Sequence, residues 1–373
     1  MEFIAAKKDF LSALQKVGGI PEQKNLSSVM AHVLLEDDGP EAVRVLAQSY
    51  EATMQVRFPA RIAQSGRLAL SGRSLLDAGR MLPEAPVHLK AQANYWADLV
   101  AGRTEYRIPG ILPENIPTHM PLPVSLEVSL PRDLLLEMVD RVGFAMSQDE
   151  GRPNLNGICL KAQPEGNGLR LEAVATDGHR LARMIRVVEG AVLSDPVSGI
   201  LHRKGVGELR RFLEGEKGPV LLGFHRSAVF FRLDGGHLMV RQIELEYPDY
   251  LRVIPTEHQW RFEVDRAEMI EAVNRTVVML GSDRTPLVRL RVETGRMTVS
   301  AQDPDRGDAR SEMDIAYEGE PFEICYNNRY MLDALKALPG QVVIFFLKDL
   351  QNATLIRTAQ DEGLLQLIMP LRV

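Results

Sequence analysis

The segment that decides the fold is Leu126-Glu127-Val128-Ser129-Leu130, followed by residues 134–142, where apolar residues recur every three or four positions. Alternating apolar residues predict a strand, and spacing by three and four predicts the buried face of a helix. The same pattern occurs twice more, at residues 3–6 with 10–17 and at residues 260–264 with 269–273. We therefore interpret the chain as three copies of one structural unit.

Two further landmarks recur in the same order. A strand ends in Ala-Gln-Ser at 47–49, Ala-Thr-Asp at 175–177 and Ala-Gln-Asp at 301–303, and a helix ends in an apolar pair at 75–82, 206–213 and 331–338. Proline-containing connectors predict domains of residues 1–122, 123–256 and 257–373. We expect two helices and about six to eight short strands in each third. Two helices cannot cover both faces of such a sheet, which favours an α+β class with antiparallel sheets and helices on one side.

The composition limits the class of protein. Of 373 residues, 45% are hydrophobic and 25% are charged, which is ordinary for a globular chain. The longest purely apolar run, residues 342–347, is far shorter than a membrane helix. We recognise no signal peptide at the N-terminus, and two cysteines provide neither a disulfide framework nor a four-cysteine zinc site. The expected location is a reducing cytoplasm.

The charge is unevenly distributed. The chain has a net charge of −6, which argues against a generic nucleic-acid binder, yet the six expected helices (7–17, 70–82, 132–142, 201–213, 264–278 and 329–338) together carry +5. Lys7, Lys8 and Lys16 contribute to this charge. Two interpretations stay open: the charges are solvated helix faces, or the helices share a surface that attracts phosphate without recognising bases.

Four motifs resemble one protein family. They are Asn154-Leu155-Asn156-Gly157, then Ala-Thr-Asp-Gly-His-Arg-Leu-Ala at 175–182, Tyr-Pro-Asp-Tyr at 247–250 with Arg-Val-Ile-Pro at 252–255, and Met-Pro-Leu-Arg-Val at 369–373. In this order, on a chain with three repeats, they are similar to the bacterial DNA sliding clamp, the β subunit of DNA polymerase III.

The resemblance implies an architecture and partners. It implies three clamp-type domains, each with sheets outside and two helices facing inside. It also implies a homodimer that closes a ring of six domains around double-stranded DNA. The ring tethers the DNA polymerase III catalytic subunit, the clamp loader and repair proteins, which dock through short apolar peptide motifs. The resemblance implies a nucleoid-associated processivity factor with no catalytic residues, cofactor, metal or membrane association.

Two sets of residues follow from the resemblance. The implied partner-peptide pocket consists of Leu155, Thr176, Gly178, His179, Arg180, Leu181, Pro248, Arg252, Val253, Leu367, Met369, Pro370, Leu371 and Arg372. The expected DNA-facing residues are Lys24, Arg73, Arg80, Arg103, Arg152, Arg203, Lys204, Arg210, Arg211, Arg329 and Lys336. The chain departs from the family pattern at Ala353, where serine is common, and at Gln48-Ser49-Tyr50 of the first repeat.

Two other classes of function were weighed. An enzyme could use Asp177 and His179 as metal ligands or as a base pair, but a site of that kind needs a third ligand and a positioned water. The first and third repeats lack this histidine. The second alternative is a degenerate clamp-like scaffold that binds peptides without encircling DNA. The acidic run at 303–308 departs from a calcium loop because its sixth position is Asp308 and not glycine.

Overall fold

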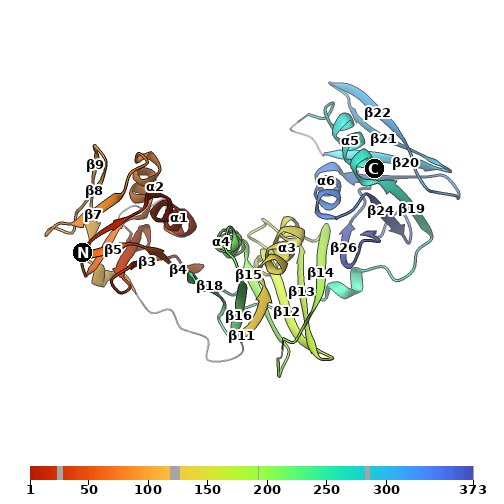
Figure 1. The fold of residues 1–373 in the computed structure, drawn as a ribbon. Coiled ribbons are helices and arrows are strands. Elements are labelled where there is room, and N and C mark those ends of the chain that lie inside the picture. Colours follow the sequence, from red (N-terminus) through yellow and green to blue (C-terminus); the bar gives the residue numbers. More distant parts are fainter. Residues whose placement is uncertain (23–27, 118–126, 192, 282–285, 373) are drawn as a thin grey trace. The chain divides into compact units, whose positions relative to one another are not determined.

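The computed structural model describes residues 1–22, 28–117, 127–191, 193–281 and 286–372 (Figure 1). The chain forms two compact units, one of residues 1–136 with 201–244 and one of residues 137–200 with 245–373. The expected domain divisions at about 122 and 256 stay predictions. Lys24 of the expected DNA-facing set lies outside the described residues.

Six α-helices occur in the described residues, each directly after a strand. They are α1 (Lys7–Val17), α2 (Gly72–Met81), α3 (Arg132–Val142), α4 (Arg203–Leu213), α5 (Arg266–Val277) and α6 (Asn328–Ala337). Side chains at the strand ends cap several of them: Ser71 accepts from the Ser74 N–H, and Asp265 accepts from the Glu268 N–H. These caps satisfy backbone donors that a helix leaves unpaired, and the helices begin within two residues of the predicted starts.

Short 3-10 turns connect some of the elements. They are η1 (Val29–Ala31), η2 (Pro113–Asn115), η3 (Gly143–Ala145), η4 (Pro153–Leu155) and η5 (Tyr250–Val253).

The first unit contains two antiparallel sheets. The five-stranded sheet has the order β5 (Arg61–Gln64), β1 (Glu2–Ala5), β7 (Val87–Ala91), β8 (Ala97–Ala101) and β9 (Thr104–Ile108). The nine-stranded sheet has the order β10 (Gly110–Ile111), β6 (Arg67–Ser71), β2 (His32–Asp37), β3 (Ala42–Gln48), β4 (Ala52–Pro59), β18 (Gly236–Arg241), β17 (Ala228–Leu233), β16 (Pro219–His225) and β11 (Glu127–Pro131).

The sheets of the second unit are also antiparallel. The eight-stranded sheet has the order β15 (Val197–His202), β12 (Gly157–Glu165), β13 (Gly168–Thr176), β14 (Arg180–Glu189), β26 (Asp361–Ile368), β25 (Thr354–Thr358), β24 (Val342–Leu347) and β19 (Trp260–Asp265). The four-stranded sheet has the order β22 (Gly307–Asp314), β21 (Arg296–Asp303), β20 (Leu287–Glu293) and β23 (Phe322–Asn327).

Strand pairing crosses the expected domain boundaries. Strand β4 of the first third pairs with β18 of the middle third, and β14 of the middle third pairs with β26 of the last. The expected α+β class with antiparallel sheets is confirmed. The described part of the first third contains ten strands, more than the expected six to eight, while each of the other two contains eight. The difference comes from β5 and β10, which are too short or too exposed to show apolar alternation.

The cores form between helices and sheets. In the first unit the rings of Phe3 and Phe10 both meet the ring of Phe58 edge to face, with centroids 5.8 and 5.9 Å away, which fixes α1 on β1 and β4. Helix α4 approaches β18 closely, since a Cβ on Gly205 would lie 2.2 Å from Val240 Cγ1. Helix α1 contacts both α2 and α4. The three helices are therefore neighbours, and the polar residues opposite their buried faces are left exposed.

Candidate functional site

The turn between β13 and β14 is built by its own side chains. The Asp177 carboxylate accepts hydrogen bonds from the backbone N–H groups of His179 and Arg180, at 2.9 and 3.0 Å. The Thr176 hydroxyl donates to the Arg180 carbonyl oxygen at 2.6 Å and accepts from the Gly178 N–H at 3.1 Å. Gly178 has a φ of +88°, a left-handed conformation that glycine adopts without strain. The Asp-Gly pair therefore holds the turn in one shape.

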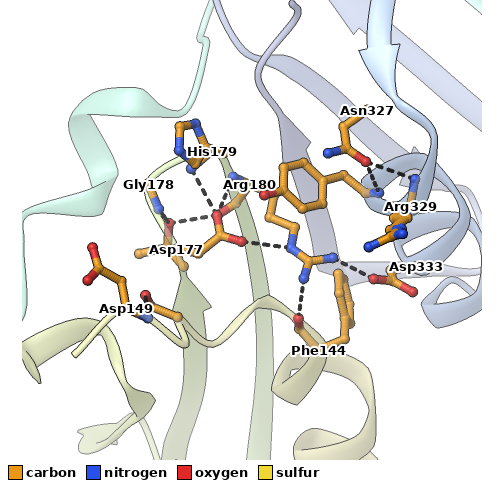
Figure 2. A network of polar contacts seen from close by, with 12 residues as sticks. Phe144, Asp149, Asp177, Gly178, His179, Arg180, Asn327, Arg329 and Asp333 are labelled. Carbon is orange, nitrogen blue, oxygen red and sulfur yellow. Dashed lines mark hydrogen bonds and ion pairs between the residues drawn. The ribbon is translucent and has the colours of Figure 1, made fainter. Parts of the chain in front are cut away.

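Arg180 connects this turn to two other elements, as Figure 2 shows. Its guanidinium donates to Asp177 at 3.0 Å, to Asp333 of α6 at 2.6 Å, and to the carbonyl oxygen of Phe144 in η3 at 2.7 Å. It also lies over the Tyr330 ring, 4.4 Å from its centroid. The side chain is only 12% exposed, so its charge is neutralised by neighbours more than by water.

A cavity of about 260 Å³ opens beside the turn. Its floor and walls come from the start of β14, the end of β26, η4, η5 and the segment before β25. Ten of the expected pocket residues line it: Leu155, Thr176, Gly178, His179, Arg180, Leu181, Pro248, Val253, Leu367 and Met369. Most of this lining is apolar, with polar groups at a few positions, a composition typical of sites for small apolar ligands.

The C-terminal tail continues past the cavity. The Met369 N–H donates to the His179 carbonyl oxygen at 2.8 Å, and the Leu371 N–H donates to the Cys325 carbonyl oxygen at 2.7 Å. The tail thus places Met369 at the cavity and then attaches to β23. Four of the expected pocket residues lie outside the lining, namely Arg252, Pro370, Leu371 and Arg372. Arg252 is instead 84% exposed and pairs with Asp249.

Three lining residues were absent from the expected set: Asp249, Tyr250 and Ala353. The Tyr-Pro-Asp-Tyr run and the departure at Ala353 both contained signals for them. Tyr250 donates to the Glu172 carboxylate at 2.6 Å, and Lys161 donates to its hydroxyl oxygen at 3.1 Å. Burial, aided by the Glu172 bond, raises the pKa of the Tyr250 hydroxyl above its usual range, so the hydroxyl stays protonated and anchors η5.

Asp177 and His179, the residues considered as an enzyme site, both make other contacts in the structure. The Asp177 carboxylate is occupied by two backbone N–H groups and by Arg180. The His179 ring lies stacked over the Tyr330 ring with centroids 6.4 Å apart. Across the described residues, no group of three or more histidine, cysteine or acidic residues could hold a metal ion. Asp177 thus serves as a turn-forming residue.

The expected DNA-facing residues form two groups. Arg73 and Arg80 of α2, together with Arg211 of α4, line one cavity of about 420 Å³ that also borders the end of α1. Each of these arginines has an acidic neighbour: Asp77 lies 3.7 Å from both Arg73 and Arg80, and Glu208 lies 2.8 Å from Arg211. This cavity brings helices from the first and middle thirds together around three cations.

The remaining basic residues are more scattered. Lys204 pairs with Glu51 at 2.6 Å, and Arg210 pairs with Glu214 at 2.8 Å. Arg203 is the first residue of α4, and Arg329 and Lys336 are exposed on α6. Arg103 is exposed in the turn between β8 and β9, and Arg152 precedes η4. Arg152 lies beside the cavity, since a Cβ on Gly178 would be 2.8 Å from its guanidinium.

None of the described helices combines the length and apolar character of a membrane span.

Family models for the DNA polymerase III beta subunit match almost the whole chain in three parts. The N-terminal domain model matches residues 1–121, the central domain model 129–249 and the C-terminal domain model 251–372.

Individual relatives agree with these models. The chain is 30% identical to the beta sliding clamp of Caulobacter vibrioides over 378 residues and to that of Pseudomonas aeruginosa over 384, covering 100% of each chain. Among solved structures, the sliding clamp of Bartonella birtlesii, bound to griselimycin, is 28% identical with a TM-score of 0.93. The beta subunit of Pseudomonas aeruginosa is 28% identical with a TM-score of 0.90. Both cover 100% of this chain and 100% of the other. The chain belongs to the DNA polymerase III beta subunit family, the bacterial sliding clamps.

Proposed function

We propose that this chain closes as a homodimer around double-stranded DNA and holds partner proteins by short apolar peptides in the cavity beside the β13–β14 turn. The expected partners are the DNA polymerase III catalytic subunit, the clamp loader and repair proteins, in the cytoplasm with the nucleoid. Three domains, divided at about 122 and 256, are part of this proposal. Such tethering raises processivity through effective concentration, without chemistry by the clamp itself.

One observation supports the peptide site: thirteen residues from five separate segments, ten of them expected, meet around an apolar cavity near the C-terminal tail. Leu181, Leu367 and Met369 offer apolar walls, and methionine adapts to side chains of different shape. A Bartonella birtlesii clamp, similar to this chain over its full length, binds griselimycin. Membership of the clamp family along all three parts favours this function over the scaffold that does not encircle DNA.

The DNA surface rests on the helix cations. Arg73, Arg80 and Arg211 gather at one cavity, and their acidic neighbours partly offset their charge. A phosphate backbone is attracted by such a surface without being held at one register, which suits a ring that slides. We include Lys204 and Arg210 of α4 in this surface. Arg329 and Lys336 of α6 are proposed to face DNA from the other unit.

The peptide site is tested by anisotropy with a fluorescent Gln-Leu-x-Leu-Phe peptide. We expect saturable binding that is lost when residues 371–373 are deleted, because the Leu371 bond to Cys325 holds Met369 at the cavity. Circular dichroism checks that the truncated chain folds. Equal affinity in both proteins would contradict the pocket assignment, and a monomer that still binds the peptide would favour the degenerate scaffold.

The DNA surface is tested by charge reversal. Arg203→Glu with Arg211→Glu is expected to impair clamp-dependent synthesis at unchanged dimer mass. Because Arg211 pairs with the buried Glu208, its substitution also disturbs that carboxylate. A second double substitution avoids this, since Arg73→Glu with Arg80→Glu changes side chains that are 62% and 55% exposed. Undiminished processive synthesis with this second pair would contradict the placement of α2 at the DNA.

A further inference from the structure

We propose that Asp333 of α6 is a positioning residue for the peptide cavity, acting through Arg180. This inference rests on the proposed peptide site. Asp333 does not line the cavity, and no sequence motif pointed to it. Its carboxylate nevertheless provides the shortest of the three polar contacts of the Arg180 guanidinium, at 2.6 Å.

Neighbouring groups contact the Arg180 side chain on several sides (Figure 2). Asp177, Asp333 and the Phe144 carbonyl oxygen accept from three different nitrogens of the guanidinium. The Tyr330 and Phe144 rings lie 4.4 and 5.2 Å from its central carbon. A planar guanidinium held in this way has one permitted orientation, which a lysine or a neutral side chain would not reproduce.

The orientation of Arg180 fixes the cavity wall. The Thr176 hydroxyl donates to the Arg180 carbonyl oxygen, and the neighbouring His179 carbonyl oxygen accepts from the Met369 N–H at 2.8 Å. Thr176, His179, Arg180 and Met369 all line the cavity. A change at Asp333 is therefore transmitted to the wall through the Arg180 side chain and the hydrogen bonds that the Arg180 and His179 carbonyl oxygens accept. Preorganised sites lose affinity when the residues that support their walls are loosened.

The same strand offers a matched comparison. Arg186, also on β14, donates to both carboxylate oxygens of Asp361, at 3.0 and 2.5 Å. This pair is partly buried as well, with side chains 24% and 12% exposed, and neither residue lines the cavity. Asp361→Asn removes a comparable ion pair from β14 without altering the groups around Arg180. It separates a general loss of stability from a local loss of positioning.

The experiment measures affinity for the fluorescent Gln-Leu-x-Leu-Phe peptide in the full-length protein. Asp333→Asn is expected to weaken binding about fivefold to tenfold, where tenfold corresponds to about 1.4 kcal/mol. Asp361→Asn is expected to stay within about twofold of the parent. Asp333→Glu keeps the charge and is expected to recover most of the affinity. Hydrogen exchange should rise at residues 177–180 in Asp333→Asn.

A double-mutant cycle tests whether Asp333 acts through Arg180. Arg180→Met removes the guanidinium, and in that background Asp333→Asn is expected to have no further effect on affinity. Additive losses, equal losses for Asp333→Asn and Asp361→Asn, or unchanged affinity in Asp333→Asn would each overturn the inference while leaving the peptide site standing. Absence of peptide binding by the parent protein would overturn both. If Asp333→Asn fails to fold, Asp333→Glu must bind like the parent and Arg180→Met must bind more weakly.

Discussion

Two turns in this molecule use the same backbone device and present different surfaces. In the first third, the Ser49 hydroxyl accepts from the N–H groups of Glu51 and Ala52 at 3.3 and 3.1 Å. In the middle third, Asp177 accepts from the N–H groups at the corresponding two positions. The next strand then pairs across a repeat boundary in both places, through β4 with β18 and β14 with β26.

The side chains at matched positions explain the difference. Arg241 donates its N–H to the Glu51 carbonyl oxygen at 2.8 Å, just as Met369 donates to that of His179. By the same register, Thr53 corresponds to Leu181. At these positions the first junction therefore has an arginine and a buried threonine where the second has Met369 and Leu181. The repeat therefore supplies a scaffold for a pocket, and a few side chains determine whether an apolar peptide fits.

The largest expected effect comes from exchanging the matched residues. Met369→Arg places the charge of the first junction in the cavity, and we expect peptide affinity to fall about thirtyfold, because an apolar peptide side chain would have to cover a charge. Met369 is 38% exposed, so folding is retained. Arg241→Met is the matched control, with unchanged affinity by anisotropy. A loss below about threefold for Met369→Arg would contradict the role of this wall.

A smaller effect is expected from the turns themselves. Gly178→Ala forces a side chain into a φ of +88° and against Arg152, which we expect to cost about 1–2 kcal/mol in the free energy of unfolding. Tyr50 holds the matching position in the first turn, is 73% exposed and is not among the described residues with a positive φ. Tyr50→Ala is expected to change stability by less than about 0.5 kcal/mol. Urea unfolding measures both changes in the free energy of unfolding. Equal changes for the two substitutions would contradict the expected difference between the turns.

The smallest effect concerns the helices that precede the two partner strands in the chain, α4 before β18 and α6 before β26. The His202 ring caps α4 by accepting from the Lys204 N–H, whereas the Asn327 amide oxygen caps α6 and cannot titrate. Burial, with Lys204 and Arg203, lowers the pKa of His202 despite Glu51. Between the folded pKa and about pH 6.5, the unfolded chain therefore binds more protons than the folded chain. The stability that neutral His202 contributes is present above about pH 6.5 and is lost as the pH falls toward the folded pKa.

The reciprocal exchange of caps measures that contribution. Urea unfolding at pH 7.5 and pH 5.5 is expected to show about 0.5 kcal/mol less pH dependence in His202→Asn than in the parent. Asn327→His is expected to add a similar dependence at α6. Identical pH profiles for all three proteins would contradict a titrating cap at α4.

Much of the fold followed from short-range patterns. The six helices, and the strands that precede α1, α3 and α5, were predicted because apolar spacing and alternation are local properties of the sequence. Strands β5 and β10 escaped prediction, since a strand with mostly exposed side chains, or one of two residues, has no such periodicity. The fold class was confirmed, and the domain divisions stay predictions.

The candidate site was predicted in outline. The Thr-Asp-Gly-His-Arg-Leu run and the C-terminal Met-Pro-Leu-Arg gave six of the thirteen lining residues through the family resemblance. Asp249 and Tyr250 were not expected, although both stand in the Tyr-Pro-Asp-Tyr motif, and Ala353 was expected only as a departure from the family pattern. The attachment of Leu371 to β23 and the contact of Asp333 with Arg180 could not be predicted, because each joins residues far apart in the chain.

The sequence by itself determined the repeated unit, the helix starts and the turn at residues 176–180, because each depends on neighbours along the chain. Only the tertiary structure decided that β14 pairs with β26, which brings Met369 to His179 and Leu367 to Leu181. The physical reason is that strand pairing and cavity formation depend on contacts between distant segments, whose register is set by packing over a whole sheet. The apolar cavity, with its charged support at Arg180, is a property of that pairing.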